Sequence, residues 1–138
     1  MTTVTLDAPR STSATSDLLA ATGRVLLAAI FVLSGVSKLA DPTGTIAYIS
    51  SAGLPASSLA YALAVIVELV GGLLLIAGFR TRIVASAIAA FSLAAAFGFH
   101  ANLADQNQFI HFFKNVAMAG GLLQVAAFGS GGFGFDRR

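Results

Sequence analysis

Four long stretches of apolar residues dominate this sequence and constrain its fold more than any other feature. They cover residues 18–39, 58–79, 83–101 and 109–128. Each stretch is close to the roughly 20 residues that an α-helix needs to cross the hydrocarbon core of a bilayer. We therefore predict four membrane-spanning helices.

The composition supports a membrane location. Hydrophobic residues make up 57% of the 138 residues and charged residues 10%, whereas a soluble domain has roughly 45–50% and about 25%. A small domain exposes much of its surface, and a surface with so few charges is expected to face lipid. This composition excludes a disordered chain and a basic nucleic-acid-binding domain, so we expect no nucleic-acid partner. The sequence has no cysteine, which excludes thiol and disulfide chemistry.

Short connections between the apolar stretches predict antiparallel neighbours. The expected fold is all-α: an integral membrane, up-and-down four-helix bundle. The first connection is longer, and Asp41 followed by Pro42 is typical of a helix start, while Gly53 and Pro55 indicate its end. We predict a short interfacial helix at residues 42–52 between the first two spans, with an ordered loop as the alternative.

The remaining segments complete the predicted domain organisation. Residues 1–17 are rich in serine and threonine and lack an apolar run, so we expect a disordered cytoplasmic arm. Residues 18–129 form the predicted transmembrane domain. Residues 130–138 are rich in glycine and are predicted to be a flexible cytoplasmic tail.

The basic residues predict the orientation. The loops on one side of the predicted bundle contain Asp41 and Asp105 and neither lysine nor arginine. Basic residues are enriched in cytoplasmic loops of membrane proteins, so both termini are expected to be cytoplasmic. The arginines on or near the other side are Arg10, Arg24, Arg80, Arg82, Arg137 and Arg138.

Ionisable residues within the spans are the candidate functional residues. A charge at the centre of a membrane helix costs about 2.5–3.5 kcal/mol on insertion scales, so each one needs a partner or a role. Glu68 lies near the middle of the second stretch, and Lys114 lies one to two turns from the outer end of the fourth. At about 1.5 Å per residue their side chains can meet, so we predict a Glu68–Lys114 pair. Lys38, His100 and Asn115 fall in the same outer half.

Two interpretations of these charges remain open. They form either a shared polar site with a functional role or a structural ion-pair network that fixes the register of the helices. Lys38 taken alone is typical of an anchor at the interface. Arg24 is expected to extend towards the cytoplasmic interface, with a pairing to Gln124 as the alternative. His100 and His111 lack the spacing of a metal site, so we predict no metal.

Several short motifs occur in an order that resembles the DoxX family of small four-helix membrane proteins. The resemblance begins at about Arg24 and runs to the end of the last apolar stretch. It implies a bacterial inner (plasma) membrane protein, and it implies association with quinone-linked oxidoreductases such as thiosulfate:quinone oxidoreductase and terminal quinol oxidase assemblies. The motifs are Ser34-Gly35-Val36-Ser37-Lys38-Leu39, Gly53-Leu54-Pro55, Glu68-Leu69-Val70-Gly71-Gly72, Gly78-Phe79-Arg80-Thr81-Arg82, Phe99-His100 and Phe113-Lys114-Asn115.

The functional hypothesis combines the resemblance with the intramembrane charges. We expect a subunit of, or accessory to, a membrane redox system, with no redox cofactor motif in the chain and a quinone as the possible ligand. A redox partner subunit and a homo-oligomer are expected partners. The alternatives are a non-catalytic assembly subunit or, less favoured, a small transporter or channel subunit. The predicted catalytic residues are Glu68, Lys114 and His100, and the predicted ligand-binding residues are Lys38, Asn115 and Ser34.

Overall fold

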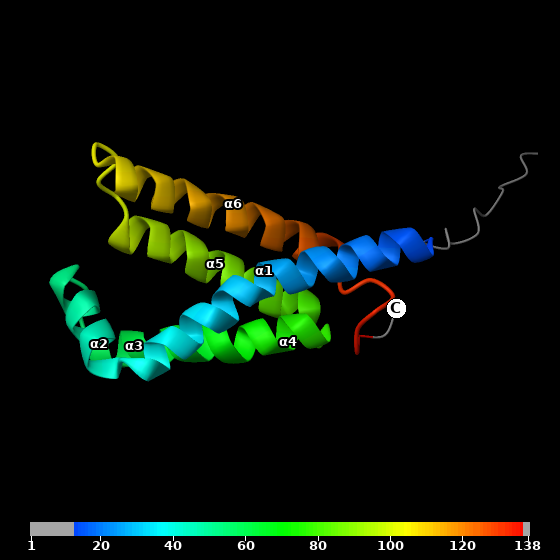
Figure 1. The fold of residues 1–138 in the computed structure, drawn as a ribbon, viewed down its shortest axis with the longest axis horizontal. Coiled ribbons are helices and arrows are strands. Elements are labelled where there is room, and N and C mark those ends of the chain that lie inside the picture. The colour runs from blue at the N-terminus through cyan, green and yellow to red at the C-terminus, as the bar shows by residue number, and fades with distance from the viewer. Residues whose placement is uncertain (1–12, 137–138) are drawn as a thin grey trace, which may run out of the picture.

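The protein is described by a computed structural model that covers residues 13–136, and this part of the chain is helical with no strand (Figure 1). The all-α prediction is therefore confirmed for the described residues. A π-helical segment, η1, joins α3 and α4 into one continuous helix, Ser57–Ala77. The elements are α1 (Ala14–Ala40), α2 (Pro42–Ser51), α3 (Ser57–Val65), η1 (Ile66–Val70), α4 (Gly71–Ala77), α5 (Thr81–Phe99) and α6 (Gln106–Phe128).

Three of the described helices are long and apolar enough to cross a membrane: α1, the continuous Ser57–Ala77 helix and α5. They correspond to the first three predicted spans. The fourth long helix, α6, has 23 residues. It is more polar than the others because His111, Lys114, Asn115 and Gln124 interrupt its apolar residues.

The helices pack as two pairs that meet at a common core. α5 and α6 lie side by side and antiparallel, while α1 packs along the α3–η1–α4 helix (Figure 1). Further contacts join α4 to α5 and α1 to α6. The core lies where these elements meet and includes the buried side chains of Phe31, Leu75, Ile88 and Leu122.

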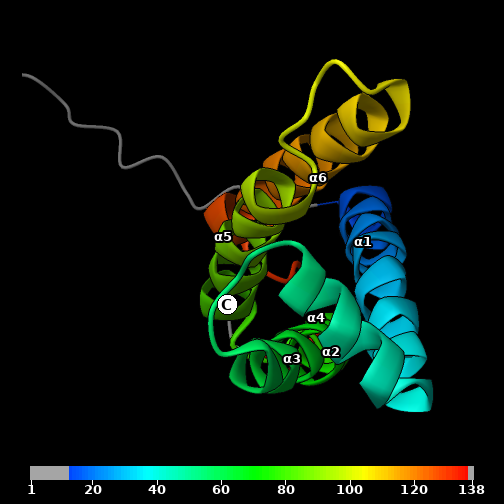
Figure 2. The ribbon, with the colours of Figure 1, turned by 90° about the vertical axis from the view of Figure 1, so that its left-hand side faces the viewer.

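The two ends of the molecule differ. We call one the α2 end: it carries the C-terminus of α1, α2 and the connection between α5 and α6 (Figure 1). We call the other the tail end: it carries the N-terminus of α1, the turn between α4 and α5, and residues 129–136. Viewed from the α2 end, α2 lies between α1 and α5 (Figure 2).

The short helix predicted after the first span is present. α2 begins at Pro42, and the Asp41 carboxylate accepts a hydrogen bond from the Gly44 amide at 2.9 Å, which caps the helix. The alternative of an ordered loop is therefore wrong. The first long helix starts earlier than predicted: α1 begins at Ala14, capped by Ser13. Residues 14–17 of the predicted arm are thus helical, and residues 1–12 lie outside the described residues.

The prediction that Arg24 extends to the interface is wrong. Its side chain is 3% exposed and donates hydrogen bonds to the backbone carbonyls of Ser130 and Phe133. The alternative partner, Gln124, is exposed and makes no bond to it. The sequence did not reveal this contact because the carbonyls come from the glycine-rich tail, which was predicted to be flexible.

Candidate functional site

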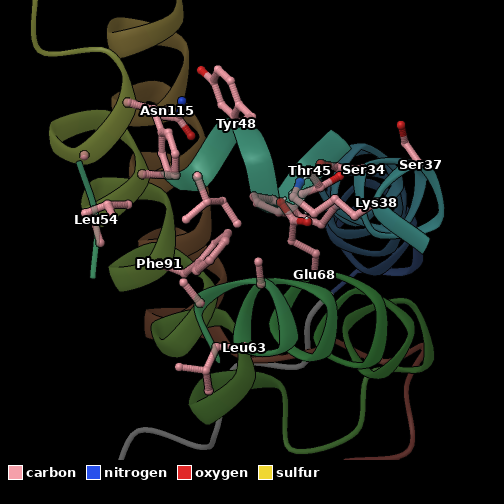
Figure 3. Close-up of a pocket in the computed structure, with 18 of the residues that line it drawn as sticks. Ser34, Ser37, Lys38, Thr45, Tyr48, Leu54, Leu63, Glu68, Phe91 and Asn115 are labelled. Carbon is pink, nitrogen blue, oxygen red and sulfur yellow. Dashed lines mark hydrogen bonds and ion pairs between the residues drawn. The ribbon is translucent and has the colours of Figure 1, made fainter. Parts of the chain in front are cut away.

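A cavity of about 780 Å³ lies at the α2 end, and side chains from α1, α2, α3, η1, α5 and α6 line it (Figure 3). Most of the wall is apolar. It includes Phe31 from α1, Leu63 from α3, Phe91 from α5 and Met118 from α6. A volume of this size lies within the roughly 300–1,000 Å³ of small-molecule sites.

The strongest polar feature of the cavity is a group formed by Ser34, Lys38 and Glu68. The Lys38 ammonium lies 2.8 Å from Glu68 Oε2 and donates a hydrogen bond to Ser34 Oγ at 2.8 Å. Ser34 in turn donates to Glu68 Oε1 at 3.1 Å. The three side chains thus form a closed ring of interactions between α1 and η1, and Figure 3 shows Lys38 and Glu68 pointing towards one another.

The local backbone positions each member of this group. Ser34 and Lys38 are four residues apart on α1, so they occupy the same helix face. Glu68 is the central residue of η1, where the π-helical turn inserts an extra residue into the helix. Such π-helical segments are frequent at functional sites. Lys38 is further fixed because Tyr61 Oη donates to its backbone carbonyl at 3.1 Å.

Burial makes this ion pair electrostatically important. Glu68 is 6% exposed, whereas the Lys38 side chain is 24% exposed. Removing Lys38 would leave the buried carboxylate uncompensated, and the loss of one partner from a fully buried pair costs about 3–5 kcal/mol, which is an upper bound here. The pair as a whole is neutral. One N–H of the Lys38 ammonium remains free, since an ammonium has three donors. The group therefore offers a carboxylate and a donor beside an apolar space.

A second polar group lines the same cavity from α5 and α6. His100 caps the end of α5, and its ring stacks on that of His111 with centroids 5.1 Å apart. Asn115 donates to the backbone carbonyl of His111 at 2.9 Å. Burial first, and then the neighbouring charge of His111, lower the pKa of His100. His100 is therefore neutral at pH 7 and can donate or accept a hydrogen bond.

The third part of the lining is α2. It contributes Thr45, Tyr48 and Ile49 to the cavity. The Tyr48 ring stacks on Phe99 of α5, with centroids 5.4 Å apart and an interplanar angle of 13°. This stack connects α2 to the helix on the opposite side of the cavity.

The structure brings together five of the six predicted site residues: Ser34, Lys38, Glu68, His100 and Asn115 all line the cavity. Lys114 does not, and the predicted Glu68–Lys114 pair is wrong. Lys114 is exposed, because adjacent residues of a helix point about 100° apart and its neighbour Asn115 takes the inward position. Glu68 pairs with Lys38 instead.

Sequence reasoning missed two features of the site. One is Tyr48, whose signal was available: an aromatic residue with a polar tip in a short helix next to the predicted spans. The other is the π-helical segment around Glu68. Residues 66–70 have the apolar pattern of an ordinary helix, so no sequence signal distinguishes this turn.

Comparison with known proteins places the chain in a family. The DoxX family model matches residues 19–101. Inner membrane protein YqjF of Escherichia coli (strain K12) is 36% identical over 114 residues, covering 83% of this chain and 86% of that protein. Inner membrane protein YphA of the same organism is 34% identical over 120 residues, covering 83% and 86%.

A shorter match involves CatD of Bacillus subtilis (strain 168), which carries the provisional name of an oxidoreductase. It is 48% identical over 61 residues, covering 44% of each chain. No solved structure matches this chain significantly. The family model covers more than half of the chain, and the two Escherichia coli proteins align over most of its length. The chain therefore belongs to the DoxX family.

Proposed function

We propose that this protein is a subunit of, or accessory to, a quinone-linked redox system, and that the cavity at the α2 end binds a quinone-like, lipid-soluble molecule. The observation that carries this proposal is the buried Ser34–Lys38–Glu68 group beside an otherwise apolar cavity. The name of CatD gives weak additional support for a redox association.

The chemistry of the lining fits such a molecule. Apolar and aromatic walls suit a ring and the start of an isoprenoid chain, while Lys38 and Asn115 have N–H groups left to donate to ring oxygens. A bound quinone would supply the electron chemistry that the chain lacks. Glu68 would hold or release the accompanying proton at its carboxylate, and Lys38 would hold the carboxylate in place.

The proposed setting is the bacterial inner membrane. We propose that α6 also spans the bilayer and completes an up-and-down four-helix bundle, with Lys114 reaching towards the interface. Arg80 lies in the turn at the tail end and Arg82 in the first turn of α5, while Asp41 and Asp105 lie at the α2 end. The excess of basic residues near the tail end supports cytoplasmic termini and a cavity in the outer half. A redox partner subunit would exchange electrons with the bound quinone, and a second copy of the chain would assemble with the first.

Binding of a short-chain quinone to the Glu68→Gln variant tests the proposal. We expect decylubiquinone to bind the unmodified protein in nanodiscs and to bind Glu68→Gln at least about tenfold more weakly. The Lys38 ammonium, which would donate to a ring oxygen, loses the carboxylate that positions it, and hydrogen bonds to charged groups contribute about 1.5–3 kcal/mol. Lys114→Gln is the matched control, because Lys114 is exposed and does not line the cavity. Equal affinities for all three proteins would remove Glu68 from ligand binding.

A structural role is the second candidate, and one observation favours it. Lys38 and Glu68 satisfy each other and connect α1 to η1, as a structural ion pair would. In that case the exchanged pair Lys38→Glu/Glu68→Lys should keep both stability and the activity of the associated redox system. The proposed ligand site predicts a different result: normal stability but weak quinone binding, because the carboxylate has moved to α1.

A further inference from the structure

The tail end contains a buried cation that the proposed function does not use. Arg24 lies ten residues into α1, yet its guanidinium points inward and is 3% exposed. It donates to the carbonyls of Ser130 and Phe133 in the tail and to that of Ile76, in α4, at 3.4 Å. Carbonyl groups from the tail therefore solvate a charge that lipid and packed side chains cannot.

Asp136 fixes the end of the tail to a helix terminus. Its carboxylate accepts hydrogen bonds from the backbone amides of Arg80 at 2.7 Å and Thr81 at 2.9 Å, where α5 has no side-chain cap of its own. Burial tends to raise the pKa of Asp136, but hydrogen bonds from Thr81 and Arg80 and the charge of Arg24 together lower it. Asp136 is thus ionised at neutral pH and serves as a cap for α5.

The tail is also packed against the turn between α4 and α5. The amides of Phe135 and Asp136 donate to the carbonyls of Ala77 at 3.2 Å and Gly78 at 2.9 Å. A Cβ atom at Gly134 would lie 2.8 Å from Ser130 Cβ and 3.2 Å from Gly78 Cα. The backbone of the tail therefore approaches this turn as closely as two glycines allow.

A third contact joins the tail to the start of α1. The Gly132 amide donates to Asp17 Oδ1 at 2.9 Å. Residues 129–136 are thus attached to α1, α4 and α5 at once, across the end of the molecule opposite the cavity (Figure 1). The attachment uses backbone groups of the tail for most of its bonds, which is why its sequence is rich in small residues.

We propose that residues 129–136 are an intrachain plug that closes the tail end of the helix assembly and keeps water away from Arg24 and the start of α5. Removing the plug would leave Arg24 without the carbonyls of Ser130 and Phe133 and with only the longer bond to Ile76. Water would then enter the helix assembly to solvate the charge. The plug does not depend on what the cavity binds, so it can be tested separately from the proposed function.

Single-cysteine accessibility tests the plug, because the natural chain has no cysteine. Thr81→Cys is the reporter: Thr81 is fully buried, and its backbone amide bonds to the tail. Ser37→Cys is the reference, since Ser37 is exposed and lines the cavity. Both are reacted with a membrane-impermeant maleimide in nanodiscs, where both ends are accessible. With the tail intact, we expect rapid labelling at residue 37 and slow labelling at residue 81.

Gly134→Val is then added to each of the two cysteine variants. The valine side chain would overlap with Ser130 and Gly78 and so displace the tail. We expect the labelling rate at residue 81 to rise at least about tenfold, which corresponds to a local opening easier by about 1.4 kcal/mol, while residue 37 is unaffected. Phe135→Ala is the matched control, because the Phe135 side chain is 79% exposed and its backbone bond is kept. This control should leave both rates unchanged.

Two results would overturn the plug. One is labelling of Thr81→Cys as fast as Ser37→Cys with the tail intact, and the other is an unchanged rate at residue 81 after Gly134→Val. If Gly134→Val loses its helical circular dichroism, a chain truncated after Gly129 replaces it. We expect this truncation to raise the labelling rate at residue 81 and not at residue 37, and an unchanged rate at residue 81 would again overturn the plug. Failure of quinone binding would not alter these rates, so the two proposals fail independently.

Discussion

At the scale of single residues, two glycines show where this fold depends on close packing. A Cβ atom at Gly35 of α1 would lie 2.9 Å from Leu69 Cβ and 3.0 Å from the Leu69 backbone nitrogen. The same atom at Gly120 of α6 would have no neighbour within 4 Å. Small residues allow close approach of helices in membranes. Gly35 therefore lets α1 approach the segment that carries Glu68.

These two glycines give a matched prediction about stability. Gly35→Ala should destabilise the protein by about 1–3 kcal/mol, because the added methyl group meets backbone atoms that cannot easily move. Gly120→Ala should be neutral or stabilising by up to about 1 kcal/mol, since alanine is the better helix former. Unfolding in mixed micelles with increasing dodecyl sulfate measures both. Equal effects of the two substitutions would show that α1 and η1 are not in close contact.

The candidate site could be predicted in part at this scale. A carboxylate in the middle of an apolar stretch, Glu68, stands out in the sequence because its burial requires a partner. The choice of Lys114 over Lys38 failed because the rotation of one helix relative to another leaves no trace in a single sequence. The depth of each residue along its helix was predictable, and the direction in which it points was not.

At the scale of elements, α2 is a part of the cavity wall that is held by few buried side chains. Ile49 is its one residue classed as buried. On the other side of the cavity, α2 contacts α5 through the stacked rings of Tyr48 and Phe99. An aromatic pair of this kind contributes about 0.5–1.5 kcal/mol. Opening of α2 should therefore respond strongly to the loss of a single ring.

Tyr48→Ala should raise the hydrogen-exchange rates of α2 amides about two- to tenfold, because the stacking energy no longer opposes local opening. Tyr48→Phe keeps the ring and should exchange at the original rate. Mass spectrometry of peptides from residues 42–51 measures the difference. Identical exchange in the two variants would mean that the ring stack does not hold α2 in place.

Most elements could be predicted from sequence, because apolar length and cap residues define them. Asp41 with Pro42 marked the start of α2, and the apolar stretches marked the long helices. The π-helical segment could not be predicted, since residues 66–70 have the apolar pattern of an ordinary helix. The local sequence therefore predicts that residues 57–77 are helical, but it does not predict the π-helical turn within them.

At the scale of the whole molecule, the charges that pair within the helix assembly form two groups with different roles. At the α2 end, Lys38 and Glu68 form a neutral pair beside the cavity. At the tail end, Arg24 and Asp136 hold the tail against the helices. The membrane location could be predicted from the composition, but the attachment of the tail to the helices could not. Glycine-rich segments are usually interpreted as flexible. The carbonyls of this one accept hydrogen bonds from Arg24, a buried residue far away in the sequence.

The central claim is that a quinone-like molecule occupies the cavity beside Glu68, and photolabelling with an azido-quinone in nanodiscs tests it most directly. We expect crosslinks in the segments 30–38 and 44–49, which contain the cavity-lining residues of α1 and α2. Unlabelled quinone and the Glu68→Gln substitution should both reduce these crosslinks, whereas Lys114→Gln should not. Two results together would contradict the claim. The crosslinks would be centred on exposed apolar residues such as Leu26, which is 69% exposed, and neither unlabelled quinone nor Glu68→Gln would reduce them.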